Sequence, residues 1–431
     1  MNLCGNVPLL KWIGVSSELK EFDFIIVGGG PAGATAARVL GQSGSRVLLI
    51  DKSRFPRDKP CGGGISARLT KRFPYLKAEL NRIPVNWVRR VHLESPAGRV
   101  VQYISEEPLY LMIRRYEFDN LLYDLAAPYV ELTQGLVRNL IRESNRVVVA
   151  TDNAQEFAAK MVIAADGANS FIARASGLKQ GNVHAQYAID MMEETPYADL
   201  NVAEHKTMYV YYGIQGHYGY GWIFPKCNHI NLGVGFKLDH YIGKMSGTHY
   251  DHHASFIEHL KAKGTVQGMS DRNAFHAFPI PITGPLPRTY TDRVVLCGDA
   301  GSFVNAFTAE GIYYAMVSGE HAANVALESL ARDDFSSNQL RTYEAAWKAE
   351  IGLELEKSFK IQRALLSDTT RIDRIVKAAS RDKGLAHLLA QYATGGISYP
   401  DFKRSMIFRA FPTYVWEKTK QWIRWGNVDE H

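Results

Sequence analysis

The residue best suited to chemistry lies in a short glycine-rich stretch, KPCGGGIS, which spans residues 59–66. Cys61 stands there between a proline and three consecutive glycines, where no regular helix or strand forms easily. A glycine run costs backbone entropy, so it usually marks a place where the main chain comes very close to another group. The thiol can donate a proton, and a charged Lys59 two residues earlier would favour the thiolate. The alternative is that Cys61 is a small, inert side chain where a larger one would not fit.

A second stretch combines glycines and an acid in the spacing that binds a dinucleotide. The segment FDFIIVGGGPAGATAARVLGQSGSRVLLIDKS reads as a buried strand, a tight turn, a helix and a second strand. Gly28, Gly30 and Gly33 fit G-x-G-x-x-G, and Asp51 stands at the end of the second strand. The glycines let the backbone approach a pyrophosphate at the helix N-terminus, while the carboxylate accepts hydrogen bonds from ribose hydroxyls. To this predicted site we also assign Pro31, Ala32 and Lys52.

The rest of the pattern predicts the elements that must position these residues. Period-two alternation with a turn at 96–98 predicts a β-hairpin, and residues 181–289 are dominated by strands rich in Tyr, Val and Phe. Near residue 293 a buried strand, a turn and a long helix return. We therefore predict an α/β (α+β) fold. Its parts are a discontinuous Rossmann-type nucleotide-binding domain (21–85, 110–180 and 290–335), an inserted antiparallel β-sheet domain for the substrate (86–109 and 181–289) and a C-terminal helical region (336–431).

The bulk composition limits the classes of function. With 431 residues the chain exceeds the usual size of one hydrophobic core, and 46% hydrophobic with 22% charged residues is typical of a globular protein. A net charge of +6 is too diffuse to predict nucleic-acid binding. The cysteines are far apart and form no CxxC pair, which argues against disulfides and zinc and favours a reducing cytoplasm. We find no signal peptide and no apolar run that would span a membrane.

Three separated segments, VGGGPAGATAA, AADGANS and CGDAGSFVNAFTAEGI, resemble the nucleotide signatures of flavin-dependent oxidoreductases of the para-hydroxybenzoate hydroxylase fold. The resemblance implies FAD as the cofactor, because a plain NAD dehydrogenase needs only the first signature. It implies that Arg115 reaches the pyrophosphate and that backbone N–H groups near Gly311 stabilise the reduced flavin ring. The further residues implied to contact FAD are Cys61, Gly62, Arg115, Asp166, Gly167, Gly298, Asp299, Gly311 and Ile312. The chain departs from the usual pattern at Ala306 and Ala309, where proline and glycine are common.

Within this fold, two segments narrow the resemblance. FPRDKPCGGGIS and YGWIFPKCNHINLGVG are similar to segments of the geranylgeranyl reductase family, in which a Lys-Pro-Cys-Gly turn and a Tyr-x-Trp-x-Phe-Pro-Lys segment ending in Gly-x-Gly recur. The resemblance implies that the glycines lie against the flavin ring and that Cys61 and Lys59 are catalytic. It implies substrate contacts for Tyr220, Trp222, Phe224, Pro225, Lys226, Gly233 and Gly235. Alternation places the three aromatic residues on one strand face, where they line an apolar channel or form ordinary sheet core.

The resemblance implies a reductase of C=C bonds in a long isoprenoid chain, such as a geranylgeranyl lipid, a prenyl quinone or a chlorophyll precursor. Such a bond has no carbonyl to polarise it, so a proton must come from Cys61, a tyrosine or an ordered water. No second dinucleotide motif is visible, so either NAD(P)H binds transiently near Asp166 or a ferredoxin- or flavodoxin-type donor protein supplies the electrons. The alternatives are a flavin-dependent monooxygenase or halogenase on the same scaffold, and a non-catalytic flavin- or lipid-binding protein.

Two further segments raise the question of a membrane partner and of a metal. FKRSMIFRAFPTYVWEKTKQWIRWGN, residues 402–427, mixes basic and aromatic residues, which suits either a helix on a membrane surface or a helix docked on the catalytic domain. We expect a cytoplasmic protein, and the first alternative would make it peripheral to the membrane. In HYDHHASFIEH, His249 and His253 are four residues apart, but no carboxylate or thiol partner is evident. We interpret this segment as an exposed helix start without a metal.

Overall fold

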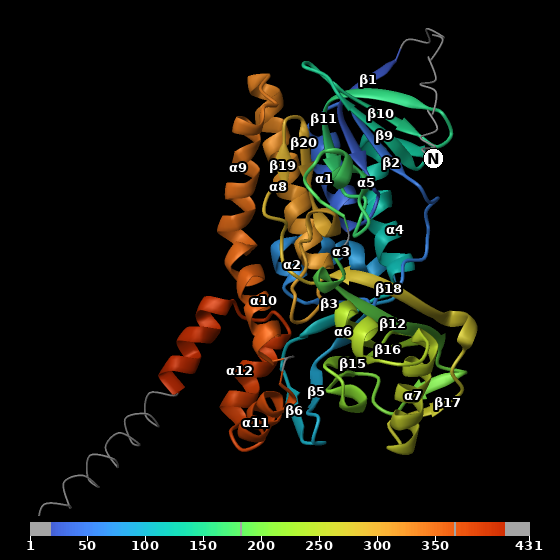
Figure 1. Ribbon diagram of the computed structural model, residues 1–431, viewed down its shortest axis with the longest axis vertical. Coiled ribbons are helices and arrows are strands. Elements are labelled where there is room, and N and C mark those ends of the chain that lie inside the picture. Colours follow the sequence, from blue (N-terminus) through green and yellow to red (C-terminus); the bar gives the residue numbers. More distant parts are fainter. Residues whose placement is uncertain (1–18, 182, 366–367, 410–431) are drawn as a thin grey trace, which may run out of the picture.

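The chain forms two stacked halves with a column of helices along one side (Figure 1). The computed structural model describes residues 19–181, 183–365 and 368–409. One half contains an eight-stranded sheet and the other a seven-stranded sheet. A small three-stranded sheet is made of β3 (Gly64–Ser66), β7 (Tyr110–Met112) and β4 (Asn86–Val88). The predicted α/β class is confirmed.

The eight-stranded sheet is the centre of the nucleotide-binding half. Its strands are β1 (Lys20–Val27), β2 (Val47–Asp51), β8 (Glu131–Gln134), β9 (Val137–Arg142), β10 (Val147–Thr151), β11 (Glu156–Ala164), β19 (Tyr290–Thr291) and β20 (Val294–Leu296). The order is β19-β20-β11-β1-β2-β8; β10 pairs antiparallel with β11, and β9 pairs antiparallel with β10. The central pairs β2–β1, β1–β11 and β11–β20 are parallel. These strands are apolar on both faces, as is usual where both faces of a parallel sheet are covered.

Helices cover one face of this sheet and a hairpin covers the other. Phe24 and Ile26 pack with α1 (Pro31–Gln42), α4 (Arg115–Ala126) and α8 (Ile312–Arg332). The opposite face packs with β9, β10 and α5 (Phe171–Ala175). Helices α1 and α8 cross closely because Gly319 has no side chain: a Cβ there would lie 2.3 Å from the carbonyl oxygen of Ala32. A Cβ on Gly298 would likewise lie 3.0 Å from the Cβ of Ala32, so the first and third nucleotide signatures lie side by side.

The seven-stranded sheet forms the second half. Its strands, in spatial order, are β18 (Phe275–Pro281), β12 (Tyr187–Pro196), β16 (His229–Lys237), β15 (Gly219–Pro225), β14 (Thr207–Tyr212), β5 (Arg90–Glu94) and β6 (Val100–Ile104). The predicted hairpin is present as β5 and β6. Neighbouring strands are antiparallel except β14 and β5, which corrects the expectation of a purely antiparallel sheet. The exception arises because the hairpin enters from the other half with its first strand running in the direction of β14.

The two faces of this sheet have different neighbours. The outer face packs against α7 (His249–Ala262), and α6 (Leu238–Lys244) lies at its edge. The inner face carries the alternate residues and lies toward the turn that holds Cys61. Strand β4 falls within the range 86–109 assigned to this sheet but pairs with β7 instead, so the sheet itself starts at Arg90. The domain boundaries remain a prediction.

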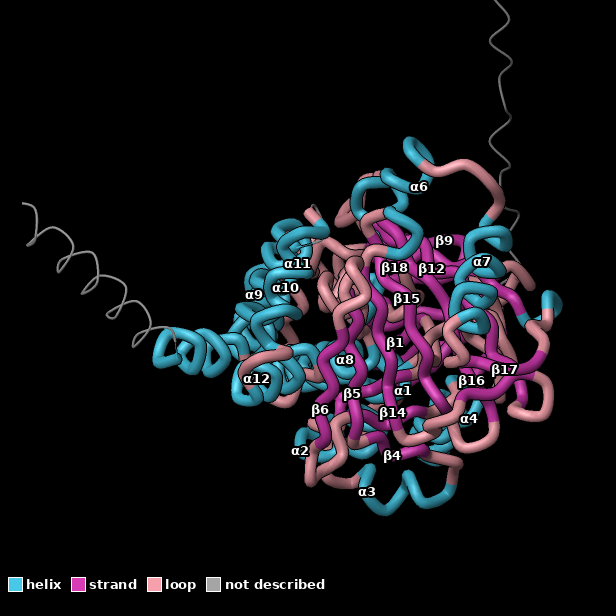
Figure 2. The backbone as a smooth tube through the Cα atoms, turned by 90° about the horizontal axis from the view of Figure 1, so that it is seen from below, coloured by secondary structure: helices cyan, strands magenta, loops and turns pink. Residues whose placement is uncertain are grey.

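The C-terminal region is helical through its described part. Its helices are α9 (Ser337–Trp347), α10 (Leu353–Leu365), α11 (Thr369–Ala379) and α12 (Lys383–Ala393), while α2 (Leu69–Arg72) and α3 (Leu76–Glu79) are short helices earlier in the chain. The hydroxyl of Tyr343 on α9 donates to the carbonyl oxygen of Leu296 at 2.7 Å, which ties α9 to β20. Helices α11 and α12 pack on Val101 of β6, beside the seven-stranded sheet (Figure 2). The column therefore spans both halves.

Only the first part of the basic and aromatic C-terminal segment belongs to the described residues. Residues 399–409 are helical, and Phe402 stacks on Tyr392 with ring centroids 4.4 Å apart. Ile407 and Phe408 are 54% and 71% exposed. The remaining basic and aromatic residues of the segment, from 410 onward, lie outside the described residues. Within the described ranges, no helix combines the length and the apolar character that crossing a bilayer requires.

Candidate active site

The first nucleotide signature forms an open cradle at the N-terminus of α1. Gly28 has φ +103° and lies so close to β11 that a Cβ would be 2.2 Å from the carbonyl oxygen of Ala165. A Cβ on Gly33 would be 1.8 Å from the carbonyl oxygen of Gly28. Around Gly30, by contrast, the only protein atom near a Cβ would be Nη2 of Arg57, at 3.5 Å, among the described residues. The helix begins there without a side-chain cap and without an acid in its first turn, so its N–H groups are available to an anion.

The acid of this signature lies where the prediction needs it. Oδ2 of Asp51 accepts a hydrogen bond from the backbone N–H of Gly29 at 2.6 Å, and Oδ1 accepts from Ser53 at 2.7 Å. The carboxylate is thereby fixed beside the glycine loop, with lone pairs left for hydroxyl donors. Lys52, assigned to the same site, is exposed, whereas Pro31 and Ala32 are buried at the helix start.

Arg57 is a cofactor-side residue that the sequence analysis missed. Its Nη2 lies 3.1 Å from Asp119, and its Nη1 is buried without a hydrogen-bond partner in the described part of the chain. A buried guanidinium donor beside an uncapped helix N-terminus fits a diphosphate. The residues present therefore fit the ADP half of FAD. The only available signal was an arginine close to the glycine turn, which many surface arginines would match.

The second and third signatures hold their acids in different ways. Asp166 accepts from Ser170 Oγ at 2.5 Å and from the N–H of Ile172 at 3.1 Å, so it caps the start of α5. Burial raises the pKa of Asp166, and the hydrogen bond from Ser170 opposes that rise. Gly167 beside it has φ +80°. Asp299 instead faces the start of α8, since a Cβ on Gly311 would be 3.4 Å from its Oδ1.

The loop before α8 is held by the C-terminal helices. Gly311 is the N-cap of α8, which begins at Ile312 without a side-chain cap or an acid in its first turn, so this helix also offers free N–H groups. At the first departure from the family pattern, the N–H of Ala306 donates to Ser358 and its carbonyl oxygen accepts from Gln362, both on α10. At the second, Ala309 takes φ +55°. Helix α10 thus supports the part of the loop where a proline is common in the family.

The Cys61 turn is clamped onto the inner face of the seven-stranded sheet. Nζ of Lys226 donates to the carbonyl oxygen of Gly62, and Nδ2 of Asn231 donates to the carbonyl oxygen of Cys61 at 3.1 Å. A Cβ on Gly62 or Gly64 would lie 3.0 Å from the ring of Phe224. The glycines are therefore required by packing against protein, on the side where a side chain would project. The flavin is predicted to approach the opposite side of this turn, and that approach stays a prediction.

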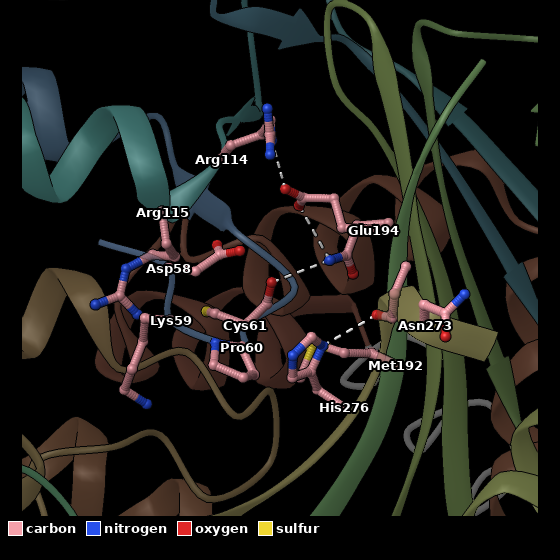
Figure 3. A pocket seen from close by; sticks show the side chains of 12 residues that line it. Asp58, Lys59, Pro60, Cys61, Arg114, Arg115, Met192, Glu194, Asn273 and His276 are labelled. Atoms are coloured by element: carbon pink, nitrogen blue, oxygen red, sulfur yellow. Dashed lines mark hydrogen bonds and ion pairs between the residues drawn. The ribbon is translucent and has the colours of Figure 1, made fainter. Parts of the chain in front are cut away.

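Asn231 joins the turn to a longer series of polar contacts (Figure 3). Its Oδ1 accepts from the indole N–H of Trp222 at 2.9 Å, and its Nδ2 also donates to Glu194 at 3.2 Å. Glu194 in turn accepts from Nε of Arg114 at 2.7 Å. Sequence reasoning missed all three polar residues. A signal existed for Asn231, because it is a polar residue on a buried strand and shares a face with Gly233 and Gly235.

A cavity of about 200 Å³ lies beside this turn. Figure 3 shows the turn, the start of α4 and strand β12 facing one another around it. Its lining residues are Asp58, Lys59, Pro60, Cys61, Arg114, Arg115, Met192, Glu194, Asn231, Asn273, Ala274 and His276. The cavity thus combines predicted catalytic and cofactor residues with residues of the sheet.

Arg115 and Lys59 bring positive charge to Cys61. Arg115 donates to both oxygens of Asp119 at 2.6 Å and is hydrogen-bonded to the Cys61 side chain. Burial disfavours the charged form of Arg115, but Asp119 and then Cys61 outweigh it and raise the pKa of Arg115. Burial, followed by the positive Arg115, lowers the pKa of Lys59 to about 8. The Nζ of Lys59 lies 3.5 Å from the centre of the Phe278 ring.

The aromatic residues of β15 do lie on one face. Ring centroids are 5.7 Å apart for Tyr220 and Trp222, and 6.2 Å apart for Trp222 and Phe224. Trp222 is only 2% exposed, and its ring fills the space above Gly233, where a Cβ would be 2.6 Å away. Pro225 ends the strand, and its carbonyl oxygen accepts from Asn86 at 2.7 Å. Burial lowers the pKa of the following Lys226 to about 8, with Glu194 opposing.

The histidine-rich segment is a helix, but it is less exposed than the sequence analysis expects. It forms α7, with His249 in the first turn, and His252 and His253 buried. His253 is fully buried against β16, because α7 turns that side toward the outer face of the sheet, and burial lowers its pKa to about 4. No group of three or more potential metal ligands occurs among the described residues.

Comparison with known proteins agrees with this geometry. Residues 22–203 match the family model described as pyridine nucleotide-disulphide oxidoreductase. Digeranylgeranylglycerophospholipid reductase 2 of Methanothermobacter thermautotrophicus is 30% identical over 361 residues, which cover 80% of this chain and 88% of that protein. Reductase 1 of the same name from Methanopyrus kandleri is 30% identical over 351 residues, covering 77% of this chain and 87% of that protein. The chain belongs to the geranylgeranyl reductase family. It is an FAD-dependent oxidoreductase.

Solved structures show the fold of this geranylgeranyl reductase family member in other proteins. A geranylgeranyl bacteriochlorophyll reductase-like protein from Thermoplasma acidophilum has a TM-score of 0.75 at 23% identity, covering 90% of this chain and 99% of the other. A flavin-dependent brominase has a TM-score of 0.70 at 17% identity, covering 91% and 100%. At such identities the likeness shows the fold alone. The same scaffold therefore serves other flavin enzymes, while the sequence relatives above are named as reductases.

Proposed function

We propose that this geranylgeranyl reductase family member reduces C=C bonds in the isoprenoid chain of a lipid. The observation that supports the proposal best is the clamped Cys61 turn, which Lys226, Asn231 and Phe224 hold against an aromatic sheet face. A long apolar chain needs such a wall to fix one double bond, since it offers no polar group near the reacting carbons. The two archaeal relatives are named for digeranylgeranylglycerophospholipid, a lipid of this kind.

In this proposal the residues of the chain position the alkene and handle the proton. Bound FAD, once reduced, supplies the hydride. Cys61 lies beside the reacting carbons, and Arg115 and Lys59 keep its surroundings positive. Tyr220, Trp222 and Phe224 align the prenyl chain, and the buried inner face excludes water. We propose that the other predicted contacts with FAD and substrate serve as the resemblance implies.

The electron donor and the location belong to the same proposal. We propose that NAD(P)H or a ferredoxin- or flavodoxin-type protein reduces the flavin, and that the enzyme works at the cytoplasmic surface of the membrane, where its lipid substrate resides. Ile407 and Phe408, exposed on the helix at 399–409, support membrane contact. Flotation with anionic liposomes, with and without residues 402–431, tests it. Unchanged binding after the deletion, or no binding by either form, would contradict it.

The decisive experiment is anaerobic. The flavoprotein is reduced with dithionite and mixed with a panel of geranylgeranyl lipids and prenyl quinones, while flavin oxidation and product mass are followed together. Oxidation of the flavin with a gain of about 2 Da per saturated bond supports the reductase. A requirement for oxygen, with a product that gains oxygen or halogen, would instead establish a monooxygenase or halogenase. Separate mixing of the oxidised enzyme with NADPH, NADH or reduced ferredoxin identifies the donor.

The role of Cys61 is tested in the same assay. We expect C61S and C61A to retain FAD and to reduce the alkene about 100-fold more slowly, the size of effect that follows when a group that positions the reacting atoms is altered. C227S is the matched control, because Cys227 lies at the exposed end of the same sheet region. Turnover close to wild type in both Cys61 variants would show that the residue only fills space.

A further inference from the structure

One buried carboxyl on the inner sheet face is not explained by the cofactor or by the Cys61 clamp. Asp190 on β12 is 4% exposed, and its Oδ1 is buried with no hydrogen-bond partner in the described ranges of the chain. Burying a carboxyl without a hydrogen-bond partner lowers the stability of the fold, so native structures usually retain such a group where it has a function. The other acids of this strand are satisfied: Glu193 accepts from Ser270 and Thr195, and Glu194 accepts from Arg114 and Asn231.

The register of three strands shows where this carboxyl points. Asp190 on β12 pairs with Gly235 on β16, and Gly235 pairs with Tyr220 on β15. The residue between the acid and the tyrosine is therefore a glycine. A Cβ on Gly235 would lie 2.5 Å from Oδ1 of Asp190 and 3.8 Å from the Trp222 ring. The carboxyl thus lies over Gly235, next to the aromatic residues assigned to the substrate and on the face that holds the Cys61 turn.

The surroundings of Asp190 raise its pKa toward neutral pH. Burial raises the pKa of Asp190 to about 7, and the positive Lys59 on the turn opposes the rise. From β15, Tyr220 lies across Gly235 from Asp190 in the register, and burial followed by the negative Asp190 raises the pKa of Tyr220. From β18, Phe278 lies directly opposite, and His276 is two residues away on the same strand. A carboxylic acid with these surroundings holds a proton that it can release to a nearby base or carbon.

We propose that Asp190 is the acid that protonates the alkene. The inference rests on the proposed reductase function. In the step, the C=C π bond and the O–H bond of Asp190 break, and the π electron pair forms a C–H bond with that proton. The neighbouring carbon forms the second C–H bond with the hydride that the reduced cofactor gives up, so the alkene gains two electrons and the cofactor loses two. Asp190 is left as a carboxylate and regains a proton from solvent before the next cycle. The missing side chain at Gly235 leaves room for the Asp190 carboxyl itself, whose Oδ1 a Cβ there would meet at 2.5 Å.

The first test needs no turnover. Infrared difference spectra of the oxidised holoenzyme, recorded while pH is changed, report the C=O stretch of a protonated carboxyl. We expect a band that titrates near pH 7, because burial raises the pKa of Asp190 to about 7, and that disappears in D190N. The matched control is E193Q, because Glu193 is a buried acid three residues along the same strand on the outer face. A band near pH 7 that persists in D190N, or no such band in the wild type, overturns the inference.

The second test follows a single turnover of the dithionite-reduced enzyme with a prenyl substrate. We expect the wild-type rate of flavin oxidation to fall as pH rises through about 7, and D190N to be about 100-fold slower with that pH dependence gone. E193Q should keep the wild-type profile. D190N with the wild-type rate and profile overturns the inference and leaves the reductase intact. Where D190N does not hold FAD, a wild-type rate that is constant from about pH 5 to about pH 9 overturns it. A wild type that reduces no prenyl substrate overturns the reductase itself, and this inference with it.

Discussion

The two glycine-rich turns of this enzyme, Gly28–Gly33 and Gly62–Gly64, differ in how far side chains constrain them. In the first, Cβ atoms added to Gly28 and Gly33 would collide with backbone carbonyl oxygens at 2.2 Å and 1.8 Å. In the second, a Cβ on Gly63 would also meet a backbone oxygen, that of Ile113 at 2.1 Å, but those on Gly62 and Gly64 would meet the side chain of Phe224. Lys226 holds this second turn from 164 residues further along the chain, so side chains distant in sequence take part in setting the turn that carries Cys61.

The two turns also differ in what they leave unsatisfied. Within the described part of the chain, the cofactor turn has N–H groups at the start of α1 without a side-chain cap and a donor on Arg57 without a partner, which suits an anionic ligand. The carbonyl oxygens of Cys61 and Gly62 already accept hydrogen bonds from Asn231 and Lys226. A turn with satisfied backbone groups keeps its shape without a ligand. The first turn is thus suited to binding an anion, and the second to holding the Cys61 side chain in place.

The largest expected effect comes from adding one methyl group to the cofactor turn. G33A places a Cβ 1.8 Å from a backbone oxygen that no side-chain movement can relieve. We expect it to cost about 4 kcal/mol or more, in the range of the most damaging point substitutions, and to abolish FAD binding. G30A is the matched control, because its Cβ meets only the flexible end of Arg57 at 3.5 Å. Thermal unfolding and flavin content measure both. A stable G33A, or a G30A as unstable as G33A, would break the distinction between backbone and side-chain constraint.

The next largest effect is expected where the second turn continues toward the third nucleotide signature. Beyond β3, Arg68 is 2.9 Å from Glu354 on α10 and 3.5 Å from Glu310 in the loop before α8, with its side chain 16% exposed. The N–H of Ser66 also donates to Glu310, at 3.0 Å. R68M removes the arginine from the buried Glu310 and the largely buried Glu354, so we expect a loss of about 3 kcal/mol in the free energy of unfolding.

The control for that variant is R72M. Arg72 pairs with Glu320 and Glu350 only four residues later, but these groups are 24% to 29% exposed. Water can therefore replace much of the interaction, and we expect about 1 kcal/mol. Chemical denaturation of both variants gives the comparison. Equal losses would show that burial of the Arg68 cluster adds nothing to its contribution to stability.

This difference between the turns explains how far the sequence could be interpreted. The strand, turn and helix around Gly28 depend on contiguous residues, so motif and periodicity were sufficient to predict them. The polar series from Trp222 through Asn231 and Glu194 to Arg114 joins three separate segments, and no spacing rule relates them. Asp190 illustrates the same limit. In the sequence it is an ordinary acid in a strand, and only the strand register places Gly235 and Tyr220 beside it.

A smaller effect is expected when the clamp itself is loosened. K226M removes the donor to Gly62 and leaves a buried carbonyl oxygen unsatisfied, a cost of about 1–3 kcal/mol, while relieving the burial that lowers the pKa of Lys226 to about 8. We expect these two effects on the free energy of unfolding to offset each other. The displaced turn should slow alkene reduction about 10-fold, with FAD retained. K263M, which removes a half-exposed partner of Glu94, should leave the rate unchanged. A wild-type rate in K226M would mean that Asn231 and packing on Phe224 hold the turn without Lys226.

The smallest effect concerns the pH dependence of stability. The folded pKa of Asp190, about 7, lies above its unfolded value of 3.8, so the folded protein binds more protons between these values and the contribution of Asp190 to stability is lost as pH rises toward 7. D190N lacks this loss, so its free energy of unfolding relative to wild type should rise between about pH 5 and about pH 8, on the order of 2 kcal/mol. D382N is a control of opposite sign. Hydrogen bonds from the N-terminus of α12 lower the pKa of Asp382, so its stabilisation is present above the unfolded pKa and fades as pH falls. Parallel trends in the two variants would show that the inner sheet face does not hold a protonated acid. The polar groups of that face would then be as fully hydrogen-bonded as those of the turn that packs on it.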